Sequence, residues 1–121
     1  MEMIHVADGR TNSRTLAIIA ISFSIDRVFA LHHDVMAEGE KVRGYTITHV
    51  GTGLGVFCGI TRIGDAERAL DTLQYKYGKL FRGLRFESAK SPRVLRIRDA
   101  IKPLAQSLPL LYTPDYWKWN T

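Results

Sequence analysis

The sequence predicts an α+β domain, in which an N-terminal antiparallel sheet of about four strands packs against two helices from the C-terminal half. Two observations predict this class: β-branched and alternating segments fill residues 15–60, and helical apolar periodicity begins only after them. At 121 residues, with 45% hydrophobic and 24% charged residues, the chain has the composition of one globular domain spanning 1–121.

The N-terminal part contains the predicted strands. Residues 1–14 are expected to form a short strand or a loose arm, and Thr15–Phe23 is rich in β-branched side chains, which predicts a buried strand. Ser24 is the expected break before a further extended segment, Ile25–His33. The polar run 34–43 is predicted to be a turn.

The clearest prediction is a β-hairpin. Gly44–Val50 alternates between two faces, and Leu54–Ile60 is its expected partner strand. The Gly51-Thr52-Gly53 sequence between them is typical of a tight connection, with Gly53 at a positive φ. These glycines do not predict a phosphate loop, because no lysine and no helix N-terminus follow them.

Two helices are predicted after the hairpin. Gly64-Asp65 is the expected cap of a helix over Asp65–Leu80, whose apolar stripe consists of Ala66, Ala69, Leu70, Leu73 and Tyr77. Ser91-Pro92 is typical of a second helix start, and Pro103 predicts a kink or a stop near Lys102. The linker Arg82–Ala89 is a candidate short strand. The second stripe consists of Val94, Ile97, Ile101, Leu104 and Leu108.

Positive charge is concentrated in one segment. Residues 76–102 contain nine Lys or Arg and two Asp or Glu, a net charge of 9 − 2 = +7, whereas residues 1–75 have 7 − 9 = −2. Such a segment favours an anionic partner: nucleic acid, a phosphorylated small molecule or an acidic protein surface. The alternative is a solvated basic face without a ligand. The predicted anion-binding residues are Arg82, Arg85, Arg93, Arg96 and Arg98, with His49 and Thr52 as secondary candidates.

The placement of the arginines on the second helix supports this choice. At 100° per residue, Arg93 and Arg96 flank the apolar stripe on one side and Arg98 flanks it on the other. A guanidinium at such a margin can form a forked contact with phosphate or carboxylate while its stem packs on the core.

Catalytic, metal and cofactor motifs are absent from the sequence. His32 and His33 are adjacent, so in a strand they point to opposite faces, and no paired cysteines or His-Glu-x-x-His motif occurs. Cys58 lies in an apolar strand, where cysteine usually behaves as a small hydrophobe. We therefore expect no metal, no cofactor and no catalytic residue, although a small enzyme built from residues distant in sequence stays open.

The remaining features concern location and self-association. A single cysteine fits a reducing compartment, and no apolar run approaches about 18 residues, so we expect a cytoplasmic protein without membrane contact. The tail 110–121 is rich in aromatic residues, which must pack on the domain's own core, on a second copy or on a partner. A homo-oligomer interface is predicted at Tyr112, Tyr116, Trp117 and Trp119.

The pattern Thr48-His49-Val50-Gly51-Thr52-Gly53 carries two resemblances. It resembles a motif in the catalytic domain of peptide-chain release factors, but the loop Glu38-Gly39-Glu40-Lys41 replaces their Gly-Gly-Gln, so peptidyl-tRNA hydrolysis is not implied. The strand-strand-helix order also resembles small phage-encoded accessory proteins. That resemblance implies a non-catalytic inhibitor of a host defence system, acting by binding a nucleotide signal or a nucleoprotein complex. Nucleic-acid binding through residues 76–102 is the alternative.

Overall fold

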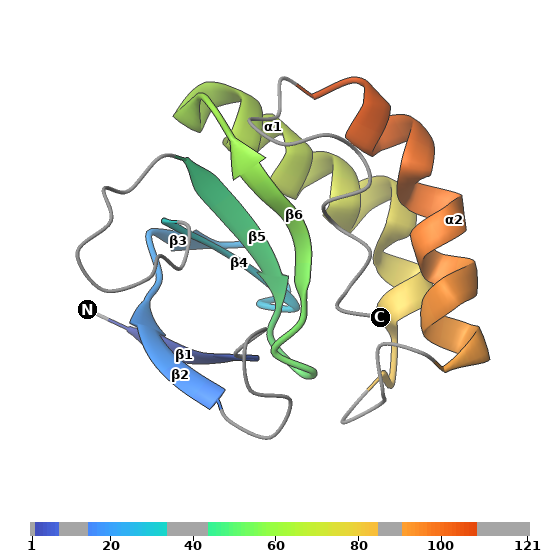
Figure 1. Ribbon diagram of the computed structural model, residues 1–121, viewed down its shortest axis with the longest axis horizontal. Helices are drawn as coiled ribbons and strands as arrows, with labels where there is room; N and C mark the ends of the chain where they lie inside the picture. The colour runs from blue at the N-terminus through green and yellow to red at the C-terminus, as the bar shows by residue number, and fades with distance from the viewer. Residues whose placement is uncertain (1, 8–14, 34–43, 85–90, 109–121) are drawn as a thin grey trace.

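The computed structural model describes residues 2–7, 15–33, 44–84 and 91–108 (Figure 1). Its strands are β1 Met3–Ala7, β2 Thr15–Ile19, β3 Ser22–Phe23, β4 Phe29–His33, β5 Tyr45–His49 and β6 Gly55–Ile60. Its helical elements are α1 Ile63–Thr72, the π-helical turn η1 Leu73–Tyr77, the 3₁₀ turn η2 Gly78–Phe81, and α2 Pro92–Gln106. The predicted α+β class, with the sheet first and the helices in the C-terminal half, is confirmed.

The strands form two antiparallel sheets. β1 pairs with β2, and a four-stranded sheet has the order β3-β4-β5-β6. The chain passes between the sheets at two adjacent residues: the Ala20 N–H donates to the Glu2 carbonyl and the Ile21 N–H donates to the Leu31 carbonyl. The predicted single buried strand Thr15–Phe23 is therefore wrong, because its two halves pair with different partners, and Ile19 and Ile21 are exposed.

The segment before β4 is a turn. Ser24 is buried and ends β3 as predicted, while Arg27 has a φ of 61° and donates its N–H to the Ser24 carbonyl. The Ser24 hydroxyl also accepts the Phe29 N–H at 3.1 Å. Only the second half of the predicted extended segment Ile25–His33 is a strand, because these bonds close residues 25–28 into a turn.

The predicted hairpin is present as β5 and β6. Ile47 faces Phe57 and Thr48 faces Gly55 across the pair, with irregular register between those positions. Gly53 has a φ of 73° and donates its N–H to the His49 carbonyl at 2.8 Å. The turn that connects the strands therefore needs the left-handed conformation that glycine adopts without strain.

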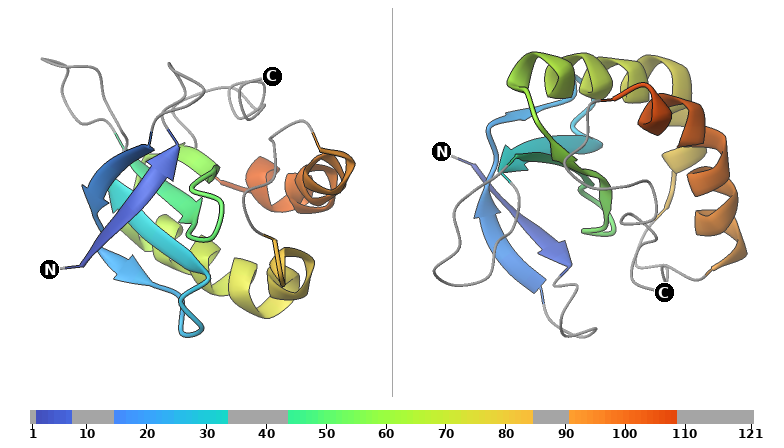
Figure 2. Two further views of the ribbon diagram at one scale, coloured as in Figure 1. Left: turned by 90° about the horizontal axis from the view of Figure 1, so that it is seen from below. Right: turned by 45° about the horizontal axis from the view of Figure 1, so that its top comes forward.

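The four-stranded sheet is covered on both faces (Figure 2). The β1–β2 hairpin lies against one face, where Ile4 and Val6 pack on Ala30 with Ile18 and Val50 beside them. The helices cover the other face, and the main hydrophobic cluster lies between them and the sheet. Its largest buried side chains include Phe29, Phe57, Phe81, Leu31, Ile47, Ile60, Leu73 and Ile101.

The helix α1 and its continuation follow the predicted stripe. Ala66, Ala69, Leu70 and Leu73 are buried, and Tyr77 packs at the margin of the cluster. The predicted cap is wrong by two residues: the N-cap is Arg62, whose side chain makes no capping bond, and Asp65 lies within the first turn. Beyond Thr72 the winding changes, first to π and then to 3₁₀ at Gly78.

The helix α2 starts where the sequence predicts. The Ser91 hydroxyl accepts the Val94 N–H at 3.2 Å, and Pro92 occupies the first turn. The helix does not stop near Lys102; it continues through Pro103 to its end at Gln106. Pro103 and the residue four positions earlier, Asp99, are both exposed, which lowers the cost of the missing backbone bond.

Two predicted segments fall wholly or partly outside the described residues. Within the linker Arg82–Ala89, the described part Arg82–Leu84 forms a turn, not a strand, and Leu84 is buried. The turn predicted over 34–43 lies outside the described residues.

Candidate anion-binding face

His49 is fixed at the end of β5 by the hairpin turn. Its ring nitrogen Nδ1 accepts the Thr52 N–H at 3.2 Å and lies 3.0 Å from the Thr52 hydroxyl oxygen, which accepts the Leu54 N–H. Because Nδ1 accepts a backbone N–H, the neutral ring carries its proton on Nε2. The two secondary candidates, His49 and Thr52, are thus joined in one bonded turn.

The surroundings of His49 keep its ring neutral. The residue is 4% exposed, and its ring centroid lies 5.2 Å from that of Phe81 and 6.0 Å from that of Phe29. Burial, and to a smaller extent the nearby positive charge of Arg93, lower its pKa from 6.5 to about 4. At neutral pH the turn therefore contributes no positive charge of its own.

Close packing accounts for Gly51 in this turn. A Cβ atom at this position would lie 3.0 Å from both the Leu84 carbonyl oxygen and His49 Cε1. The hairpin turn is thus pressed against the backbone that follows η2. This contact and the positive φ of Gly53 explain both glycines without a ligand.

Arg93 connects α2 to η2. Its guanidinium donates to the carbonyl oxygen of Arg82 and, at 3.4 Å, to that of Leu80. These carbonyls lie at the C-terminal end of a helical turn, where a positive charge is favourable. Arg93 is therefore a brace between two helical elements as well as a cation, a role that its place beside the apolar stripe did not reveal.

The other predicted arginines occupy different environments. Arg98 is half-buried, with 27% of its side chain exposed, and its Nε lies 4.0 Å from an Asp99 carboxylate oxygen. Arg96 and Arg82 are exposed, and the prediction that Arg96 edges the buried stripe is wrong, because at 100° per residue Arg96 lies about 100° from Ile97 and about 160° from Val94, on the outer side of the helix. The structure brings Arg82 and Arg93 into contact. Arg85 lies outside the described residues.

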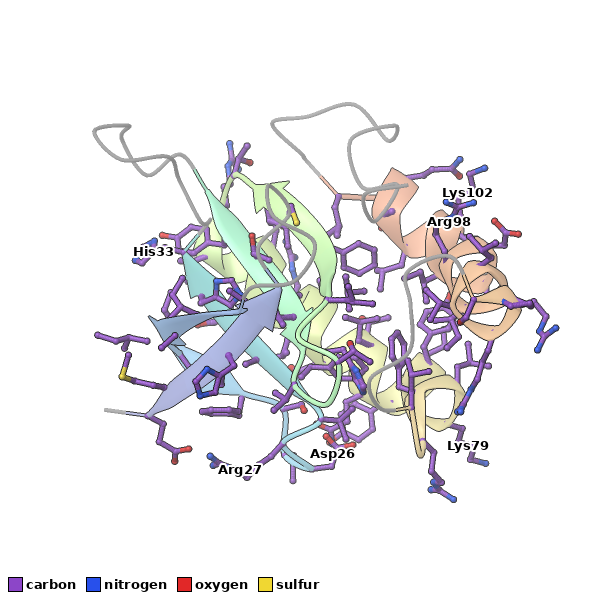
Figure 3. The ribbon with its side chains drawn as sticks, turned by 60° about the horizontal axis from the view of Figure 1, so that its bottom comes forward. Asp26, Arg27, His33, Lys79, Arg98 and Lys102 are labelled. Atoms are coloured by element: carbon purple, nitrogen blue, oxygen red, sulfur yellow. The ribbon has the colours of Figure 1, made fainter. Side chains whose placement is uncertain are left out.

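Together these cations form what we call the basic face: the described Lys and Arg side chains of η1, η2, the turn after it and α2. Figure 3 shows Lys79 on η2, with Arg98 and Lys102 farther along α2, all on the helical side of the molecule. Asp99 is the acidic residue of these elements within the described residues. The members of the basic face are Lys76, Lys79, Arg82, Arg93, Arg96, Arg98 and Lys102.

Sequence reasoning missed Tyr75, which lies beside this face. Its side chain is 76% exposed in the π-helical turn, next to Lys76. The signal was present: Tyr75 is an aromatic residue outside the apolar stripe, between Gln74 and Lys76. The predicted interface residues of the aromatic tail lie outside the described residues.

The described ranges include the chain's four histidines and its cysteine. They contain no group of three or more histidine, cysteine, aspartate or glutamate side chains placed to hold a metal ion. None of the helices described combines the length and the apolar character that crossing a bilayer requires. No protein-family model, curated protein or solved structure matches the chain.

Proposed function

We propose that the chain is a non-catalytic binding protein whose basic face holds an anionic partner. The observation that carries this proposal is the unbalanced charge of the face. Its seven cations are accompanied by Asp99, and among the described residues only Arg98 approaches that carboxylate within 4.0 Å. Cations concentrated in this way raise the local concentration of an anionic partner and its rate of association.

The members of the face have different roles in this proposal. Arg93 holds η2 against α2 through two backbone carbonyls, so it shapes the face. Lys79, Arg82 and Arg96 are exposed and form no ion pair with a described residue, so they are the groups that contact the partner. His49 and Thr52 support the face from beneath by fixing the hairpin turn.

The resemblance to small phage-encoded accessory proteins supports a biological setting for this proposal. In that setting the chain inhibits a host defence system in the host cytoplasm, and its partner is a nucleotide signal or a nucleoprotein complex.

Self-association through the aromatic tail belongs to the same proposal. Removal of residues 112–121 should convert an oligomer to a monomer or lower the melting temperature. If light scattering and the melting temperature both stay unchanged, the aromatic residues of the tail neither form a self-interface nor pack on the domain's own core.

Two double variants that each remove two positive charges test the basic face. Lys79→Ala with Arg96→Ala removes charge from the face, and Arg62→Ala with Arg68→Ala removes the same charge from exposed positions at and near the start of α1. Binding is measured against three labelled probes: a mononucleotide, an oligonucleotide and an acidic peptide.

The face variant should weaken binding of at least one probe. It should also lower the slope of log affinity against log salt by about 1 for each phosphate contact removed. The α1 variant should bind like the wild type. Equal effects of the two variants, or no binding of any probe by the wild type, would overturn the proposal.

A further inference from the structure

Tyr75 is an exposed aromatic ring in an unusual backbone segment. Its side chain is 76% exposed within η1, and π-helical turns of this kind occur often at functional sites. Beside it, Gln74 accepts the Ile25 N–H at 2.6 Å, which ties η1 to the turn before β4. The ring is thus presented to solvent on a segment that is held from the sheet side.

Cations extend from this ring in one direction. Lys79 follows Tyr75 by about one turn, and the exposed Arg82 lies in the turn directly after η2. Arg93 bonds the carbonyls of Leu80 and Arg82, so α2 and its exposed Arg96 continue the surface. The basic face therefore begins beside an accessible aromatic ring.

In the opposite direction the charge changes sign. Asp71 is exposed and lies one turn before Tyr75 on α1. Its carboxylate repels a phosphate on that side of the ring. A phosphate backbone next to Tyr75 is therefore favoured toward Lys79 and away from α1.

From this arrangement we infer that the basic face binds single-stranded nucleic acid, with one base stacked on Tyr75 and the phosphates following Lys79, Arg82 and Arg96. The inference rests on the proposed function and names its partner. Aromatic platforms beside a cationic track are the usual means of binding single strands. In a duplex the bases are already stacked on one another, so the ring gains nothing there. A mononucleotide would use only the cations nearest the ring.

The test uses a labelled oligothymidine of about 12 nucleotides, within the usual range of site sizes, and measures fluorescence anisotropy. Tyr75→Ala should weaken binding about 5- to 100-fold, the range expected for loss of one stacked base, and leave the salt dependence unchanged. Tyr75→Phe keeps the ring and should restore the affinity. Ile25→Ala removes the neighbouring exposed side chain, which cannot stack, and should bind like the wild type.

Several outcomes would overturn the inference. Unchanged binding by Tyr75→Ala shows that the ring does not stack on a base. Equal affinity for a duplex or for thymidine monophosphate shows that the partner is not a single strand. Losses of the same size in Ile25→Ala and Tyr75→Ala indicate an apolar docking surface for a protein instead.

The same data separate this inference from the proposed function. If another anionic probe binds through Lys79 and Arg96 while oligothymidine does not, the single-strand inference fails and the basic face stands. If no probe depends on Lys79 and Arg96, both fail. Because Tyr75 is exposed, the melting temperature of Tyr75→Ala should match the wild type, which keeps the binding result interpretable.

Discussion

The two faces of the four-stranded sheet each bury a histidine, and the two residues are held differently. His32 faces the β1–β2 hairpin, and both of its ring nitrogens are bonded: Nδ1 to the His33 carbonyl at 2.6 Å and Nε2 to the Thr48 hydroxyl at 2.7 Å. His49 lies on the helical side, where its Nδ1 is bonded to a surface turn and a cation, Arg93, lies nearby. One histidine belongs to the interior alone, and the other lies beneath the basic face.

This difference separates stability from binding in the molecule. A buried polar group with its partners in place specifies packing and offers nothing to a ligand. On the helical side, charged groups remain exposed next to the core, as Arg96 does. Substitutions on the face that packs against β1 and β2 should therefore change the free energy of unfolding. Substitutions on the outer surface of the helices should change binding.

The largest expected effect on stability is at His32, on the face of the sheet that packs against β1 and β2. His32→Ala removes a fully buried ring and leaves the Thr48 hydroxyl without its partner, which should cost about 2–4 kcal/mol of unfolding free energy. Urea denaturation measures the loss. Under conditions where the variant is folded, its anion affinity should match the wild type; a specific loss of affinity would contradict the division between the faces.

Acid should destabilise the protein through His49. The unfolded chain binds a proton near pH 6.5, but the folded protein binds it only near pH 4 because the ring is buried near Arg93. Between these values the unfolded state holds more protons, so stability falls as pH falls, by up to about 3 kcal/mol.

The matched control for this effect is His49→Asn, whose side-chain oxygen can accept the Thr52 N–H but cannot titrate. Denaturation of both proteins at pH 7 and at pH 4.5 isolates the contribution of His49. The variant should show a smaller loss on acidification than the wild type. Equal losses would show that other groups cause the acid sensitivity.

The turn between β5 and β6, on the helical side of the sheet, is the next site at which a substitution should lower stability. Gly53→Val places a β-branched residue at a φ of 73°, which should cost about 1–3 kcal/mol. Gly53→Asn tolerates this conformation and serves as the control. Thermal melting distinguishes the two, and an unchanged melting temperature in Gly53→Val would contradict the turn.

Local patterns were sufficient for the elements whose period lies within one segment. The alternation of β5, the stripe from Ala66 to Leu73 and the Ser91-Pro92 start all follow from neighbouring residues, and each is present. The division of Thr15–Phe23 could not be predicted. It depends on which strand each half pairs with. The sequence around Ile19 is the same whether its side chain faces solvent or the core.

The candidate site shows the same limit. Charge arithmetic located the basic segment, because it needs no tertiary information. The brace from Arg93 depends on carbonyl groups 11 and 13 residues earlier, which only the folded chain brings within reach. Tyr75 lies opposite the stripe at 100° per residue and is exposed, but the sequence does not show the change of winding beyond Thr72 in which it lies.

The brace itself predicts a smaller effect on stability. Arg93→Lys keeps the positive charge, but one guanidinium nitrogen, Nη2, bonds both carbonyls, and the shorter lysine side chain places its ammonium group short of that position. We expect a loss of about 1 kcal/mol by urea denaturation, with a larger loss in Arg93→Ala. If Arg93→Lys and the wild type are equally stable, charge alone holds the two elements together.

The smallest effect on stability should come from Arg96, and it completes the comparison. Arg96 is exposed and forms no ion pair with a described residue, so Arg96→Ala should change the free energy of unfolding by less than about 0.5 kcal/mol. Its effect on binding should be clear, because each phosphate contact that is lost lowers the slope of log affinity against log salt by about 1. Arg96→Lys retains the charge and should keep that slope if the partner is a phosphate backbone. Unfolding curves combined with salt titrations of binding make the check, and a destabilised Arg96→Ala variant with an unchanged salt slope would place this residue with the interior instead of the binding surface.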